Sequence, residues 1–160
     1  MSSLRSFFKF LKTEGNLLND PTVGISAPKQ ESLLPKALDT DMIDKLLNFK
    51  PKNWIESRDK ASLELIYSSG LRLSELCSLD LKDLLLEEQM CRVLGKGNKE
   101  RICPIGSKAI EALEDWFSHR GKIAKDDVKA VFVNKEGNRL GPRTVQVRLK
   151  KISLDRGLPY

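Results

Sequence analysis

Apolar positions in the first half of the chain follow a helical period. Spacings of three and four residues recur in three stretches, and they predict amphipathic helices over 3–13, 40–49 and 58–69. The third stretch carries apolar residues on several sides. We therefore expect its helix to be buried over most of its surface.

Residues that commonly cap helices stand at the predicted boundaries. Gly70 follows the third helix, where a residue in the left-handed conformation often ends a helix. Serine, threonine and aspartate side chains accept hydrogen bonds from the free amides at helix starts. On that basis we expect N-caps at Asp39 or Thr40, Ser57, Ser74 and Ser107.

The pattern changes in the second half of the chain. Short apolar runs with β-branched residues over 84–105 predict two or three antiparallel strands, with a hairpin at Gly95–Lys99. Helical spacing returns over 107–119 and again over about 142–155. The segment "AVFVNKEGNRLG", residues 130–141, between these helices is expected to form a short strand and a turn.

The first helix stands apart from the other elements. Residues 19–38 contain three prolines and no sustained periodicity, which is typical of a linker. We expect 39–160 to form one domain and 1–18 to be the last helix of another, because a lone helix cannot bury its own apolar stripe. We expect that helix to pack on a neighbouring molecule, to fold back on the domain or to be disordered. The predicted fold class is α+β, mainly helical, with a small antiparallel sheet.

Composition places the chain among globular proteins. It has 160 residues, of which 40% are apolar and 31% charged. No apolar run approaches the roughly 18 residues of a membrane-spanning helix, and the first residues lack the features of a signal peptide. We expect a cytoplasmic protein without a membrane partner. The net charge of +6 and the pI of about 9.3 favour an acidic partner.

The cysteines give no sign of a metal site. Cys77, Cys91 and Cys103 form no CxxC pair, and His119 is the one histidine in the sequence. We expect buried reduced thiols, and a cap or surface role for the histidine. No metal ligand is predicted.

Basic residues gather in two clusters. The first lies on the hairpin and is opposed only by Glu100; the second lies on and around the last helix and is opposed only by Asp155. This separation of basic from acidic residues is what binding to a phosphate backbone requires, although a solvated basic face is the ordinary alternative. The predicted DNA-binding residues are Arg92, Lys99, Arg101, Arg139, Arg143, Arg148, Lys150 and Lys151.

One arginine lies outside both clusters. Arg72 stands in a short break between apolar runs, beside Leu71 and Leu73. An arginine pinned among leucines usually holds an anion. The glycines that flank Lys96 at the hairpin tip let the backbone turn tightly and approach a partner closely.

These segments together resemble a known family. "SSGLRLSELCSLDLKDL", "VLGKGNKERICPIG" and "VFVNKEGNRLGPRTVQVRLKKI" are similar to the catalytic domain of Xer-type tyrosine recombinases, within the phage-integrase family. The first two motifs occur together, in order and at the family's spacing. The resemblance runs from about residue 3 to the end. It implies that residues 1–18 belong to an N-terminal DNA-clamping domain and that the rest is the N-terminal part of the catalytic domain.

The resemblance also implies a chemistry. In this family a tyrosine attacks a DNA phosphate, which leaves a 3′-phosphotyrosyl link and a free 5′-hydroxyl, without metal or other cofactor. By matching positions, Arg72 is the first of two active-site arginines and Glu75 the supporting carboxylate. Lys96 is the hairpin lysine that protonates the leaving 5′-oxygen. The implied partners are duplex DNA and other recombinase protomers, with no small-molecule ligand.

Part of the family's site has no counterpart in these 160 residues. The histidine–x–x–arginine box and the nucleophile do not occur, and neither Tyr67 nor Tyr160 matches the nucleophile's position. We expect a recombinase fragment that binds DNA without cutting it. A non-catalytic DNA-binding or regulatory protein with the same fold is the alternative, and a basic protein-interaction domain is a third.

Overall fold

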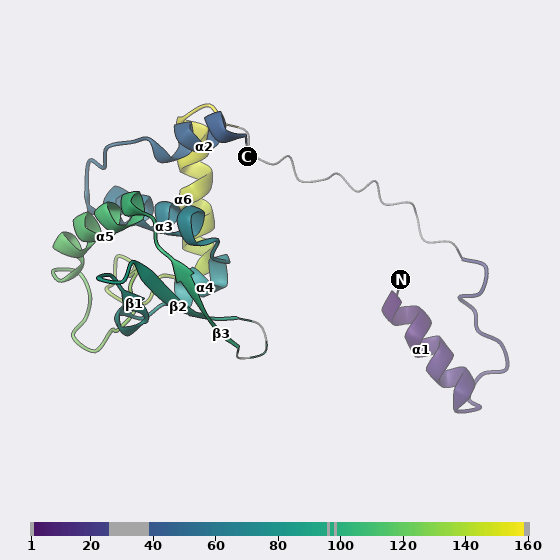
Figure 1. The fold of residues 1–160 in the computed structure, drawn as a ribbon. Coiled ribbons are helices and arrows are strands. Elements are labelled where there is room, and N and C mark those ends of the chain that lie inside the picture. Colours follow the sequence, from purple (N-terminus) through teal and green to yellow (C-terminus); the bar gives the residue numbers. More distant parts are fainter. Residues whose placement is uncertain (1, 26–38, 96, 98, 159–160) are drawn as a thin grey trace. The chain divides into compact units, whose positions relative to one another are not determined.

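The computed structural model describes residues 2–25, 39–95, 97 and 99–158 (Figure 1). The chain divides into two compact units, Met1–Ala37 and Leu38–Tyr160, and each is described by itself. Within the described ranges, no helix is both long and apolar enough to cross a bilayer.

The first unit contains helix α1 (Ser2–Thr13), which confirms the predicted helix. Its apolar stripe is partly uncovered, since Leu4 and Phe7 are both more than half exposed. The segment that follows turns back over the helix, and Pro21 and Ile25 line one hollow with Leu4 and Phe8. This segment therefore covers part of the stripe, whereas packing of the helix on the domain or on a neighbouring molecule stays a prediction.

Among its described residues, the second unit has five α-helices: α2 (Thr40–Leu47), α3 (Trp54–Ser69), α4 (Leu73–Ser78), α5 (Ser107–Arg120) and α6 (Pro142–Asp155). Helix α3 is the central one, because it packs against the other four and most extensively against α5. Eight of its residues are buried, as the all-round apolar pattern predicted. Figure 1 shows α3 and α5 together on one side of a small sheet.

The sheet has three antiparallel strands in the order β1–β2–β3 and joins a short 3-10 helix at Leu81–Asp83. The strands are β1 (Leu84–Leu85), β2 (Met90–Leu94) and β3 (Glu100–Pro104). The predicted hairpin is confirmed, since β2 pairs with β3 over all five residues.

The core is built around Trp116, which has no exposed surface. Its ring stacks between Trp54 and Phe132 at centroid distances of 6.5 and 6.4 Å, and its indole N–H donates to the carbonyl oxygen of Val131 at 3.0 Å. A buried tryptophan usually has a hydrogen-bond partner for its indole N–H, and Trp116 has one. The three cysteines are buried and free, as predicted.

The caps predicted at Ser57 and Ser107 are wrong. Asn53, not Ser57, caps α3, because the Asn53 Oδ1 atom accepts from the amides of Ile55 and Glu56 at 3.1 Å. Ser57 lies inside the helix, where its hydroxyl donates to the carboxylate of Asp115. Helix α5 begins at Ser107 itself, with Gly106 at the N-cap. The Asp39 cap and the left-handed Gly70 are confirmed.

The strand predicted near residue 130 does not form. Ala130 and Val133 each make one isolated bridge, to Asp80 and Arg139 respectively. Lys129 and Val131 bond to Leu81 and Leu79, and Phe132 and Asn134 bond to Leu140 and Asn138, so each pairing ends after two backbone hydrogen bonds. The predicted turn is present and contains Gly137, with a φ of 75°.

A buried ion cluster joins α3 to α6. The Asp59 carboxylate accepts from the buried Arg58 at 2.8 Å on one oxygen and from Arg148 on the other. The Arg58 Nη1 atom also donates to the carbonyl oxygen of Val133 at 3.0 Å. The carboxylate therefore compensates two cations and fixes the C-terminal helix on the central one.

We predict that Asp59→Asn lowers the free energy of unfolding by about 3–5 kcal/mol, because it leaves the buried Arg58 without a counter-charge. Asp126→Asn, at an exposed position, is the matched control and changes it by less than about 0.5 kcal/mol. Urea denaturation followed by circular dichroism measures both. Equal losses in the two variants would contradict the role assigned to the cluster.

Candidate functional site

The loop between α3 and α4 presents Arg72. Gly70 ends α3 in the left-handed conformation, with φ 59°, and Leu71 anchors the loop in the core at 5% exposure. Arg72 then adopts an extended backbone at the N-cap of α4, and its side chain is 70% exposed. The apolar anchor thus fixes the backbone while the guanidinium stays accessible, as its setting in the sequence suggested.

Glu75 caps α4 from within the helix. Its Oε2 atom accepts from the amide of Arg72 at 2.7 Å, and its Oε1 atom accepts from the Arg72 Nη1 atom at 3.0 Å. The predicted Ser74 cap is therefore wrong, since the helix begins one residue earlier and the carboxylate satisfies the free amide. Arg72 and Glu75 therefore lie side by side.

Arg101 reaches the same carboxylate from β3. Its Nη1 atom donates to Glu75 Oε1 at 2.7 Å and its Nη2 atom to Oε2 at 2.8 Å, a bidentate pair. Glu75 is only 4% exposed. The hydrogen bonds from Arg101, and then those from Arg72, lower the pKa of Glu75 to about 2 even though burial opposes this shift. The same contact raises the pKa of Arg101.

The hairpin base lies against this cluster. The Gly95 amide donates to the Lys99 carbonyl oxygen at 2.8 Å and closes the hairpin. A Cβ atom on Gly95 would meet the Arg101 Nη1 atom at 3.4 Å, so the glycine leaves room for the guanidinium. Lys96 lies outside the described residues, and its role as the hairpin lysine of the site stays a prediction.

The predicted DNA-binding residues fall into two groups. The first consists of Arg92, Lys99, Arg143, Lys150 and Lys151, all of them exposed. The second consists of three arginines that hold carboxylates or backbone carbonyl groups of the domain, although Arg139 is exposed as well. Arg101 holds Glu75, Arg148 pairs with Asp59, and Arg139 pairs with Asp80 while donating to the carbonyl oxygens of Cys77 and Leu79. A DNA contact by any member of either group stays a prediction.

Sequence reasoning missed the contact between Arg101 and Glu75. A signal was available in the strand period, because alternate residues of a strand face the same side. Arg101 shares its side of β3 with the buried Cys103, while Glu100 and Ile102 are exposed. That alternation separates Arg101 from the exposed Arg92, the other arginine of the hairpin.

Other basic residues were also missed. Lys45, Lys50 and Lys52 line a hollow of about 990 Å³ together with Arg148 and Lys151 of α6. They come from the end of α2 and the loop after it, so the two basic segments meet only in the folded domain. Spacing along the sequence carries no sign of this grouping.

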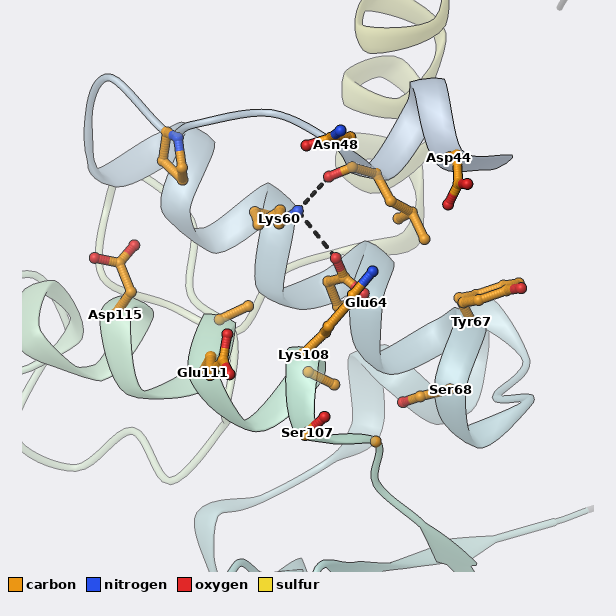
Figure 2. Close-up of a pocket in the computed structure, with 15 residues that line it drawn as sticks. Asp44, Asn48, Lys60, Glu64, Tyr67, Ser68, Ser107, Lys108, Glu111 and Asp115 are labelled. Atoms are coloured by element: carbon orange, nitrogen blue, oxygen red, sulfur yellow. Dashed lines mark hydrogen bonds and ion pairs between the residues drawn. The ribbon is translucent and has the colours of Figure 1, made fainter. Parts of the chain in front are cut away.

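A separate pocket of about 750 Å³ lies where α2, α3 and α5 meet (Figure 2). Lys60 projects into it and pairs with Glu64 at 2.9 Å, and it also donates to the carbonyl oxygen of Leu47. Glu111 and Asp115 line the α5 side. The pocket shares no lining residue with the Arg72 cluster, and among the described residues no His, Cys, Asp and Glu grouping suits a metal.

Comparison with known families decides the classification. The sequence profile of the Phage integrase family matches residues 36–159. The chain belongs to this family. Tyrosine recombinase XerC of Pseudomonas savastanoi pv. phaseolicola is 51% identical over 151 residues, covering 94% of this chain and 50% of the relative. XerC of Shewanella amazonensis is 46% identical over 157 residues, covering 98% and 53%.

These comparisons confirm the resemblance to Xer-type recombinases. The chain spans about half the length of the curated relatives that it matches. Among solved structures, a XerH site-specific recombinase bound to difH substrate has a TM-score of 0.76 at 22% identity, covering 96% of this chain and 48% of that one. A lambda integrase dimer bound to a core site has a TM-score of 0.74 at 17% identity, covering 99% and 57%. The predicted fold class is thereby confirmed.

We predict that Glu75→Gln lowers the free energy of unfolding by about 3 kcal/mol at pH 7, the equivalent of the pKa difference between 4.5 and about 2. Because the pKa of Glu75 is lowered by folding, the ionised carboxylate stabilises the fold at pH values above its ordinary pKa. This contribution is lost as the pH falls and the carboxylate becomes protonated. The difference between wild type and variant should therefore shrink as the pH falls from 4.5 towards 2. Urea denaturation at several pH values measures it, with the exposed Glu88→Gln as control. A difference that does not change with pH would refute the assignment.

Proposed function

We propose that this chain is part of a XerC-type site-specific recombinase that cuts and rejoins duplex DNA through a 3′-phosphotyrosyl intermediate. The observation that carries the proposal is the Arg72–Glu75 pair within a matched family motif. An exposed arginine that is oriented by a buried carboxylate is what a phosphoryl-transfer site requires. Solved relatives described as bound to DNA support the same substrate class.

Arg72 has the geometry to bind the scissile phosphate. The non-bridging oxygens of the phosphate carry negative charge, and a guanidinium can donate two parallel hydrogen bonds to them. Glu75 accepts from the Arg72 Nη1 atom and from its amide, which leaves other donors of the exposed side chain for a ligand. The low pKa of Glu75 keeps its carboxylate ionised at neutral pH, so its hold on Arg72 persists.

Lys96 is the proposed general acid for the leaving 5′-oxygen. A lysine ammonium carries three donors on a flexible stem, so it can deliver a proton to the leaving oxygen. The attacking tyrosine and the second active-site arginine are assigned to a segment of the family that these 160 residues do not include. No metal or other cofactor is part of the proposed reaction.

The exposed basic residues of the hairpin and of α6 are proposed to contact the DNA backbone, where lysine and arginine supply most of the affinity. We assign residues 1–18 to the end of a DNA-clamping domain, 19–38 to the linker and 39–160 to the catalytic domain. Other protomers are the proposed protein partners, in line with the dimer and tetramer described for lambda integrase. A cytoplasmic location follows from the proposed chromosomal or mobile DNA substrate.

We predict that the 160-residue polypeptide binds duplex DNA weakly and with little sequence preference. If about four to six basic residues meet phosphates, log K should fall against log salt with a slope of roughly −4 to −5. Lys96→Ala should reduce the steepness of that slope by about one contact. Fluorescence anisotropy at several salt concentrations measures both, and binding that does not respond to salt would exclude a phosphate interface.

The same polypeptide should form no covalent DNA complex, because stabilisation of a transition state cannot replace an absent nucleophile. A suicide substrate analysed on a denaturing gel tests this. An adduct that disappeared in Tyr160→Phe or Tyr67→Phe would refute the assignment of the nucleophile. Tight, sequence-specific binding by the full gene product without any adduct would favour the regulatory alternative.

A further inference from the structure

The geometry points to Arg101 as a positioning residue that fixes the hairpin base and Arg72 to one shared carboxylate. The two hairpin arginines, Arg92 and Arg101, look alike in the sequence, and both were assigned there to DNA. The structure separates Arg101 from Arg92. The importance of Arg72 for DNA chemistry rests on the proposed function, whereas the contact between Arg101 and Glu75 does not.

Two donors of Arg101, one on each Nη atom, are occupied inside the protein. Each oxygen of Glu75 accepts one bond from Arg101 and one from Arg72, so four bonds meet on one carboxylate. If Arg101 turned outward to a phosphate, it would abandon a carboxylate that is only 4% exposed. Leaving a buried charge without its main partner is strongly unfavourable. DNA contact by Arg101 is therefore disfavoured relative to its neighbours.

Arg101 also joins two elements that are 26 residues apart in the sequence. It lies at the start of β3, directly after the hairpin turn, and its guanidinium approaches Gly95 on the other arm. Glu75 lies in a helix of only six residues whose N-cap is Arg72. One side chain thus links the hairpin base to the Arg72 loop, so a displacement of either element changes the setting of the other.

The residue type matters because the contact is bidentate. A guanidinium presents two parallel N–H donors to the two carboxylate oxygens, whereas a lysine ammonium can compensate the charge without fixing its direction. Arg101→Lys should therefore keep the fold and lose the orientation. Arg101→Gln removes both the compensating charge and the fixed orientation. Arg92→Gln on β2 is the matched control, because Arg92 is an exposed arginine on the neighbouring strand.

The first measurement is amide hydrogen exchange of Arg72 by NMR, without DNA. Loss of charge-assisted bonds to Glu75 should speed exchange of this amide by about tenfold or more in Arg101→Gln, and by less in Arg101→Lys. Arg92→Gln should leave it unchanged. Full protection of the Arg72 amide in folded Arg101→Lys and Arg101→Gln would overturn the proposal.

The second measurement is salt-titrated DNA binding. A residue that touches a phosphate lowers the steepness of the slope by about 0.9 when it is removed, as expected for Arg92→Gln. A positioning residue acts through its partner, so Arg101→Gln should have no further effect in an Arg72→Gln background. If Arg101→Gln lowered the steepness of the slope by about 0.9 both in the wild type and in the Arg72→Gln variant, Arg101 would contact a phosphate directly. If the wild-type chain does not bind DNA at all, the proposed function fails, while the exchange measurement still decides the role of Arg101.

Discussion

The buried carboxylate of Glu75 is the constraint on which the candidate site depends. An ionised group at 4% exposure is stable only when donors surround it, and here a helix N-cap and a strand supply them together. Arg101 and Arg72 lower the pKa of Glu75 to about 2, so the charge is permanent under physiological conditions. The loop, the short helix and the hairpin base are consequently held in one arrangement around a single side chain.

The rest of the domain supplies a rigid frame for this arrangement. Trp116 and Phe132 fill the core against α3, and Asp59 ties the same helix to α6 through Arg148. Because α3 is fixed on several sides, the glycine at its end directs the following residues to a defined place. Arg72 is therefore exposed in its side chain but not free in its backbone. This combination favours binding an anion without much reorganisation.

Basic residues that look equivalent along the chain have different roles in the fold. Arg101, Arg139 and Arg148 hold carboxylates or backbone carbonyl groups, whereas Arg92 and Arg143 extend from the surface. The net charge therefore overstates the cations that can meet a polyanion. The lysines after α2 compensate in part, because folding brings them beside α6. An electrostatic footprint is a property of the folded surface rather than of charge clusters in the sequence.

The sequence by itself determined most of the elements and the family. The periodicity over about 142–155 predicted α6, the glycine-containing turn predicted the hairpin, and two motifs at a fixed spacing predicted the match. These features depend on local preferences and on residues close in the chain. The tertiary structure decided which residues meet. Ser57 bonds to Asp115 instead of capping its helix, and Arg101 rather than its neighbours holds Glu75. A donor takes whichever acceptor the packing brings within about 3 Å, and a local pattern does not specify an acceptor that is distant along the chain.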